Sequence, residues 1–118
     1  MAKLKVWHNP RCRKSRETVA LLNERGVELE ITLYLETPPD ADELGRVLNL
    51  LNLEPRQLMR RKEAPYKELN LAADHHSRDD LIAAMVAHPI LIERPVVMNS
   101  TRAALGRPPE NVLKLLDP

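Results

Sequence analysis

The sequence contains very little cysteine. Its 118 residues include one, Cys12, so the chain cannot form an internal disulfide, which suits a reducing compartment such as the cytoplasm. Any redox cycle through Cys12 must therefore finish on a thiol from another molecule. A dithiol Cys-x-x-Cys oxidoreductase is also excluded, because Ser15 stands where the second cysteine would be.

Long apolar runs and a strong net charge are absent as well. No apolar run approaches the roughly 20 residues of a membrane-spanning helix, and we find no apolar signal-peptide region at the N-terminus. The formal net charge is +1, so bulk charge gives no reason to expect nucleic acid or an anionic membrane as a partner. With no internal repeat, the length predicts a single domain over residues 1–118, and we expect it in the cytoplasm.

The segment that holds Cys12 joins a predicted strand, Leu4–Trp7, to a predicted helix that begins at Arg13 and stops near Gly26. Helix N-termini and nearby cations both lower the pKa of a cysteine, and this segment provides both. We therefore expect a reactive thiolate beside helical N–H groups that can hold an oxyanion. The candidate helpers are His8, which adds positive charge when protonated, and Ser15, which can donate its hydroxyl to the thiolate or order the first helical turn.

Simpler interpretations of these residues stay open. An isolated cysteine is most often an unreactive buried residue, and the neighbouring Arg11, Arg13 and Lys14 are individually typical of a solvated helix start. The pair His75 and His76 favours a solvated loop over a metal site, because the spacing of metal ligands is missing elsewhere. We expect no metal and no bound cofactor.

Apolar periodicity, capping residues and prolines predict the other elements. They are a strand over residues 29–35, a helix after Asp40 through Leu51, a short helix from Pro55 to Leu58, a helix after Ser77 to His88, a hairpin over residues 96–105, and a last helix opened by Pro108 and Pro109. The order is β-α-β, a helical insert, then β-β-α. It predicts a thioredoxin-like α/β fold whose mixed sheet has a parallel first pair and a helical insertion. Cys12 would lie at the carboxyl end of the first strand, where such sheets bind ligands.

The residues from His8 to Arg16 resemble the active-site loop of the glutaredoxin-coupled arsenate reductases, the ArsC family. The resemblance extends along the chain to the segments at residues 34–39, 58–69, 88–97 and 106–110. Arg11, Arg13 and Lys14 make the loop more basic than in the best-known plasmid enzymes, and the chain more closely resembles the short chromosomal members.

The resemblance implies a role for each matching position. Cys12 falls on the nucleophile, and the positions that bind the oxyanion are Arg60, Arg94 and Arg107. His8 and Ser15 fall on residues that help to keep the nucleophile as a thiolate, and Arg94-Pro95 coincides with the cis-proline site of thioredoxin-like folds. The implied reaction reduces arsenate to arsenite with glutathione as co-substrate and glutaredoxin as the protein partner.

Two other functions remain as hypotheses. One is a glutathione-dependent thiol oxidoreductase that acts on another substrate. The other is an Spx-like transcriptional regulator that binds RNA polymerase, although those redox sensors usually carry Cys-x-x-Cys and Ser15 weighs against it.

Overall fold

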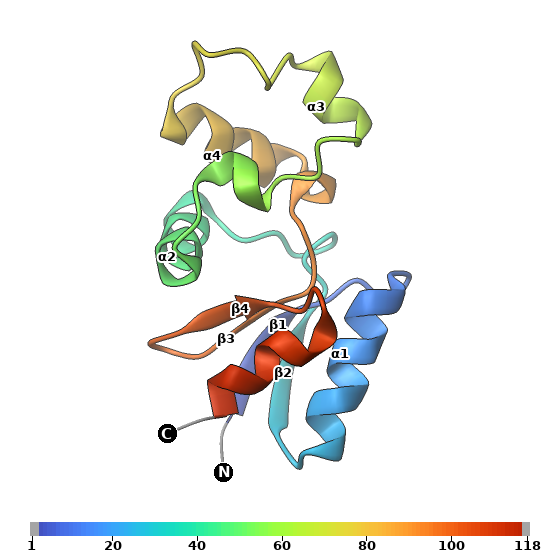
Figure 1. The fold of residues 1–118 in the computed structure, drawn as a ribbon. Helices are drawn as coiled ribbons and strands as arrows, with labels where there is room; N and C mark the ends of the chain where they lie inside the picture. Colours follow the sequence, from blue (N-terminus) through green and yellow to red (C-terminus); the bar gives the residue numbers. More distant parts are fainter. Residues whose placement is uncertain (1–2, 117–118) are drawn as a thin grey trace. The chain divides into compact units, whose positions relative to one another are not determined.

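The computed structural model describes residues 3–116 and divides into two compact units. The sheet unit joins the N-terminal stretch through Thr37 to the C-terminal stretch from Arg94 (Figure 1). The helical unit is the continuous segment Pro38–Glu93. A single domain over residues 1–118 stays a prediction, and its first two and last two residues lie outside the described part of the chain.

The described part of the sheet unit contains one four-stranded mixed sheet (Figure 1). Its strands, in the order β2-β1-β3-β4, are formed by β1 (Lys3–Trp7), β2 (Glu28–Thr32), β3 (Val96–Met98) and β4 (Ala103–Leu105). β1 pairs with β2 in parallel, whereas β3 runs antiparallel to both β1 and β4. The predicted parallel first pair and the predicted C-terminal hairpin are therefore confirmed.

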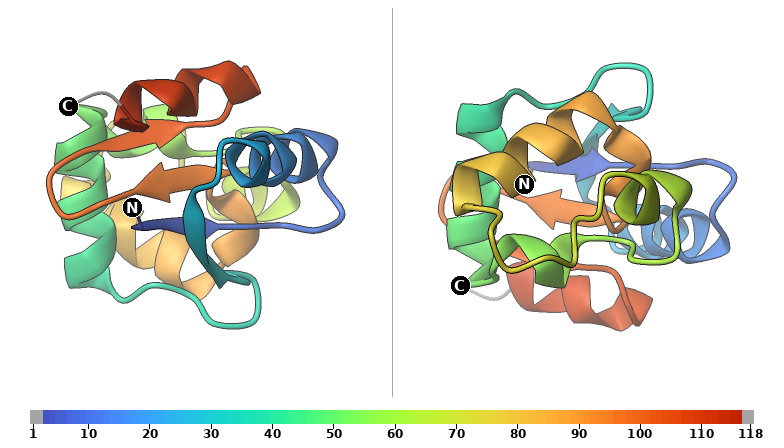
Figure 2. Two further views of the ribbon diagram at one scale, coloured as in Figure 1. Left: turned by 90° about the horizontal axis from the view of Figure 1, so that it is seen from below. Right: turned by 90° about the horizontal axis from the view of Figure 1, so that it is seen from above.

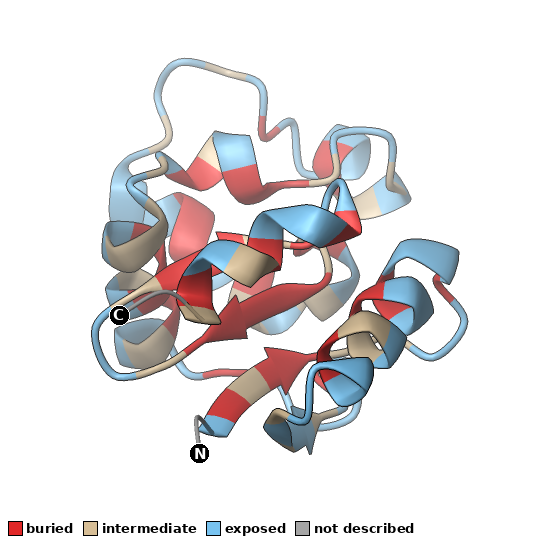
Figure 3. Ribbon diagram, turned by 60° about the horizontal axis from the view of Figure 1, so that its bottom comes forward, coloured by how far each residue is buried: buried red, intermediate tan, exposed pale blue. Residues whose placement is uncertain are grey.

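Two helices pack on one face of this sheet. They are α1 (Arg13–Glu24) and η3 (Pro109–Leu116), and η3 lies along β4 (Figure 2). Leu22 of α1 and Val112 of η3 meet Leu4 and Val6 of β1 in one apolar core. Burial is accordingly concentrated on β1 and β3 (Figure 3). The predicted last helix is present, but it winds as a 3-10 helix.

The strand predicted over residues 29–35 is partly wrong. β2 ends at Thr32, and the Leu33 carbonyl then accepts the N–H groups of Glu36 and Thr37, both at 2.9 Å, in a turn. The apolar alternation also fails, because Leu33 is 37% exposed whereas Tyr34 is only 1% exposed. β2 is an edge strand with one neighbour, so period-two spacing could not show where the chain would leave the sheet.

The helical unit contains two longer helices and three short ones among its described residues. They are α2 (Ala41–Leu51), η1 (Pro55–Leu58), α3 (Ala64–Glu68), α4 (Arg78–Ala87) and η2 (Pro89–Leu91). Asp40 caps α2 by accepting the Glu43 N–H at 2.8 Å, as predicted, and Ser77 caps α4. α3 was not predicted. None of the helices in residues 3–116 is long and apolar enough to cross a membrane.

Gly106 lets three segments of the sheet unit approach closely. Its N–H donates to the Pro95 carbonyl at 3.0 Å as the chain leaves β4. A β-carbon at this position would meet Thr18 Oγ1 and lie 2.6 Å from Pro95 Cγ, so there is no room for a side chain. The absence of a side chain at Gly106 therefore allows the segments at the start of β3 and the end of β4 to pack against α1.

We predict that Gly106→Ala destabilises the protein by about 1–3 kcal/mol, because overpacking must shift Thr18 or Pro95. Gly45→Ala is the matched control: a β-carbon in this α2 position would make only an ordinary 3.9 Å contact with Ile82. It should stabilise by about 0.5–1 kcal/mol, since alanine favours a helix over glycine. Urea unfolding measures both changes, and unchanged stability in Gly106→Ala would contradict the close packing.

Candidate active site

Cys12 lies directly before α1, at the N-cap position, and is 9% exposed. Asn9 shapes the turn that leads to it: the Asn9 carbonyl accepts the Cys12 N–H at 2.9 Å, and its side-chain oxygen accepts the Arg11 N–H at 3.0 Å. No role for Asn9 was predicted from the sequence. Its position before Pro10 was the available signal, because asparagine side chains commonly bond backbone groups two residues on.

The cations next to Cys12 in the sequence serve mainly to hold the turn or face solvent. Arg16, near the start of α1, donates from Nη1 to the Pro10 carbonyl at 2.9 Å. This hydrogen bond stabilises the loop that leads to Cys12. Arg13 is exposed and pairs with Glu17 at 3.6 Å. The side chains of Arg11 and Lys14 are exposed as well. The charge that acts on Cys12 comes from a distant part of the sequence.

Arg94 supplies that charge. Burial by itself raises the pKa of Cys12, but hydrogen bonds from the Ser15 and Lys14 N–H groups and the charge of the nearby Arg94 guanidinium together lower it by more. The Arg94 side chain also hydrogen-bonds to the sulfur. The net result is a Cys12 pKa below its ordinary value, which favours the thiolate.

His8 and Ser15 form a hydrogen-bonded pair in which Ser15 is buried and His8 is partly buried. His8 Nδ1 lies 2.6 Å from Ser15 Oγ, and that hydroxyl oxygen also accepts the Asn9 N–H at 3.0 Å. Burial, and then the charge of Arg16, lower the pKa of His8, so the ring is mainly neutral near pH 7. His8 therefore adds no full positive charge there, and Ser15 reaches the sulfur through its backbone N–H.

Arg107 is linked to the same group of residues. Its Nη1 donates to the Arg94 carbonyl at 3.3 Å. Arg94 therefore acts on Cys12 through its side chain and is bonded to Arg107 through its backbone. Both Arg94-Pro95 and Arg107-Pro108 are cis peptide bonds, which confirms the predicted cis-proline at Pro95. The sheet unit thus brings together five predicted site residues: His8, Cys12, Ser15, Arg94 and Arg107.

The sixth predicted site residue, Arg60, belongs to the helical unit. Its guanidinium lies on two carboxylates, with Nη1 2.8 Å from Glu63 and Nε 3.9 Å from Glu93. All three side chains are about one quarter exposed. The Arg60 N–H donates to the Leu91 carbonyl at 2.7 Å, which ties this residue to the segment ending at Glu93.

One residue of the histidine pair, His76, contacts the backbone of the same loop. His76 Nε2 donates to the Asn70 carbonyl at 2.8 Å, and the two rings lie 4.2 Å apart. Across residues 3–116, no three His, Cys, Asp or Glu side chains are placed to hold a metal ion.

We predict that Arg94→Gln raises the pKa of the Cys12 thiol, because it removes the positive charge that opposes the effect of burial. The pH dependence of Cys12 alkylation by iodoacetamide reports this pKa. Arg25→Gln, at the far end of α1, is the matched control and should leave the profile unchanged. Coincident profiles for Arg94→Gln and the native protein would show that Arg94 does not stabilise the thiolate.

We also predict that His8 makes the fold less stable in acid. The unfolded chain takes up a proton near the ordinary histidine pKa of 6.5, whereas folded His8 resists it, so unfolding becomes easier as the pH falls below that value. His8→Gln cannot titrate and should lose less unfolding free energy between about pH 7.5 and 5.5. Equal losses in both proteins, measured by urea unfolding, would contradict this assignment.

Comparison with known proteins agrees with this fold. The ArsC family model matches residues 7–115. The chain is 54% identical over 114 residues to the uncharacterized protein YfgD of Escherichia coli K12, covering 96% of both chains. It is 46% identical over 117 residues to an arsenate reductase of Neisseria meningitidis serogroup B, covering 98% of this chain and 100% of that one.

A solved structure, the arsenate reductase from Vibrio cholerae, is also similar. It superposes with a TM-score of 0.93 at 50% identity, covering 96% of this chain and 97% of that chain. The likeness confirms the predicted α/β, thioredoxin-like fold class with its helical insertion. With a family match over nearly its whole length, this chain belongs to the ArsC family.

Proposed function

We propose that this protein is an arsenate reductase that converts arsenate to arsenite through the Cys12 thiolate, with glutathione and glutaredoxin as reductants. The observation that carries the proposal is the Arg94 guanidinium on a buried cysteine at a helix N-terminus. Relatives of the chain named arsenate reductase support the choice of substrate. A cytoplasmic location belongs to the proposal, because glutathione keeps a lone thiol reduced there.

The arginines are proposed to bind the substrate. Arsenate near neutral pH is a tetrahedral anion, and one planar guanidinium group can bind two of its oxygens at the same time. Arg94 and Arg107 are joined through the Arg94 carbonyl, which supports a shared role. For Arg60 the support is chemical: its guanidinium already binds carboxylate oxygens, and an oxyanion could replace them.

The first step is attack by the thiolate. Cys12 Sγ forms a bond to As(V), and one arsenic–oxygen bond breaks, releasing hydroxide that takes a proton to become water. Positive charge from Arg94 stabilises both the thiolate and the oxygens of the adduct. We assign His8 and Ser15 to positioning, because their bond and the Asn9 N–H hold the turn that presents the Ser15 N–H to the sulfur.

The reduction then needs a second thiol. Glutathione sulfur replaces another arsenic-bound oxygen as water, and the two sulfurs join in a Cys12–glutathione disulfide. Each sulfur thereby gives one electron, As(V) becomes As(III), and arsenite leaves. A glutaredoxin thiolate attacks the glutathione sulfur and releases the Cys12 thiolate. This sequence uses only the one cysteine that the chain has.

We predict that NADPH consumption with arsenate, glutathione, glutaredoxin and glutathione reductase requires Cys12. Cys12→Ser should reduce the rate to that without the protein, because a hydroxyl is not ionised near neutral pH and cannot form the disulfide. Reactions without arsenate or without glutaredoxin are the controls.

Two results of this assay, or one result with a different substrate, would overturn the proposal. Full activity in Cys12→Ser would show that Cys12 is not the nucleophile. The absence of an arsenate-dependent rate in the native protein would show that the protein does not reduce arsenate. Arsenate-independent reduction of a glutathionylated peptide, with no arsenate turnover, would instead support a thiol oxidoreductase that acts on another substrate.

A further inference from the structure

The backbone of the helical unit holds two carboxylates beside the guanidinium of Arg60. The Arg60 N–H donates to the Leu91 carbonyl at 2.7 Å. In the other direction, the Glu93 N–H donates to the Leu58 carbonyl at 2.7 Å, so the two segments pair in an antiparallel bridge. A turn brings Glu63 to the same place, since its N–H donates to the Arg60 carbonyl at 3.2 Å. Both carboxylates therefore start from positions that are fixed relative to Arg60.

The carboxylate of Glu63 acts on Arg60 and not on its own helix. Glu63 occupies the N-cap position of α3, where a side-chain oxygen commonly accepts a helix N–H. Its Oε2 instead lies 2.8 Å from Arg60 Nη1. A change of Glu63 to glutamine therefore removes a charge from Arg60 and leaves the start of the helix without a lost cap.

The group around Arg60 carries more negative than positive charge. Its one guanidinium faces two carboxylates, with Nη1 on Glu63 at 2.8 Å and Nε on Glu93 at 3.9 Å. All three side chains are only about one quarter exposed, so solvent ions screen these charges less than they screen fully exposed ones. Two of the three guanidinium nitrogens are thus occupied, and the remaining negative charge repels an approaching anion.

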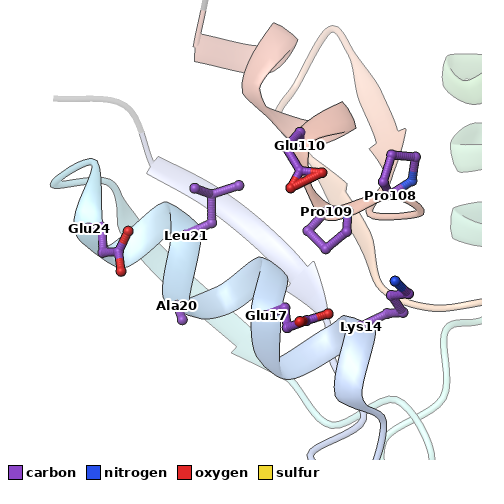
Figure 4. A pocket seen from close by; sticks show the side chains of 8 residues that line it. All are labelled: Lys14, Glu17, Ala20, Leu21, Glu24, Pro108, Pro109 and Glu110. Atoms are coloured by element: carbon purple, nitrogen blue, oxygen red, sulfur yellow. The ribbon is translucent and has the colours of Figure 1, made fainter.

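A groove between α1 and the start of η3, in the sheet unit, offers no substitute for Arg60 (Figure 4). Its volume is about 400 Å³, which is enough for a small ligand. Its charged side chains are the single ammonium of Lys14 and the three carboxylates of Glu17, Glu24 and Glu110. This excess of negative charge repels an oxyanion, so the binding of arsenate depends on the arginines and on the groups that compete for them.

We propose that Glu63 sets the affinity of the protein for oxyanions, because its carboxylate competes with the substrate for Arg60. Glu93 is a second and weaker competitor, since its carboxylate lies farther from the guanidinium. When arsenate binds, its oxygens replace the Glu63 carboxylate on Arg60, and the carboxylate turns to solvent. This exchange breaks and forms ion pairs only. The inference rests on the proposed function, in which Arg60 binds arsenate.

The test is the dissociation constant of inorganic arsenate, measured by calorimetry in the Cys12→Ser background, where no arsenic–sulfur bond can form. Four proteins are compared: the background itself, Glu63→Gln, Arg60→Gln, and the variant with both changes. Glu68→Gln is the matched control, because it removes the same charge from an exposed position of the same helix, α3.

We predict that Glu63→Gln lowers the dissociation constant of arsenate roughly two- to fivefold, the range for a partly exposed ion pair. Glu68→Gln should leave it unchanged. Without Arg60 the gain from Glu63→Gln should be clearly smaller, because the carboxylate then has no guanidinium to occupy. Weaker, unchanged or undetectable arsenate binding in Glu63→Gln would overturn the proposal. An equal gain with and without Arg60 would also overturn it, since the carboxylate would then act only through its general charge.

A second measurement separates this proposal from the reductase assignment. Phenylglyoxal modifies arginine side chains, and peptide mass spectrometry follows its reaction with Arg60 in the native protein without arsenate. Modification should be faster in Glu63→Gln than in Glu68→Gln, because a guanidinium released from a carboxylate is more accessible. That result supports the competition even when arsenate turnover is absent. Equal modification rates in the two variants would overturn it even when arsenate turnover is present.

Discussion

The contact between the Arg94 guanidinium and the buried Cys12 sulfur is the interaction on which the site depends. Burial disfavours a thiolate, so the fold must hold a positive charge close to the sulfur to stabilise it. The antiparallel pairing of β1 with β3 brings that charge, because Trp7 pairs with Val96 at the end of the shared ladder. Arg94 lies just before Val96, and Cys12 follows Trp7 after a short turn. The sheet register therefore determines the chemistry of the cysteine.

Several small contacts in the sheet unit keep this arrangement in place. Gly106 permits β4, Pro95 and α1 to approach closely, and the next residue, Arg107, bonds the Arg94 carbonyl. On the other side of the sulfur, Asn9 and Arg16 hold the turn through backbone atoms. These contacts position the groups around the sulfur.

The sequence predicted that the pKa of Cys12 is lowered, but some of the groups that lower it differ from those predicted. The cations next to Cys12 in the sequence suggested a thiolate held by side chains, but the structure has their side chains exposed or bonded elsewhere. The helix N-terminus does act as expected, through the backbone N–H groups of Ser15 and Lys14, and the side-chain charge comes from Arg94. His8 was considered as a cation, yet burial lowers its pKa and makes it a neutral partner of Ser15. Sequence shows which charges are near along the chain, whereas burial decides which of them act.

The sequence by itself determined the features that depend on neighbouring residues: the strand, turn and helix around Cys12, the caps at Asp40 and Ser77, and the monothiol chemistry of a single cysteine. Resemblance to the ArsC family singled out Arg94 and Arg107, which spacing could not have separated from the other arginines. Only the tertiary structure decided that Arg94 contacts the sulfur, that Arg60 lies on Glu63 and Glu93, and that β2 ends early at the sheet edge. Those outcomes depend on strand pairing and burial between segments far apart in the chain, and no local pattern of residues encodes them.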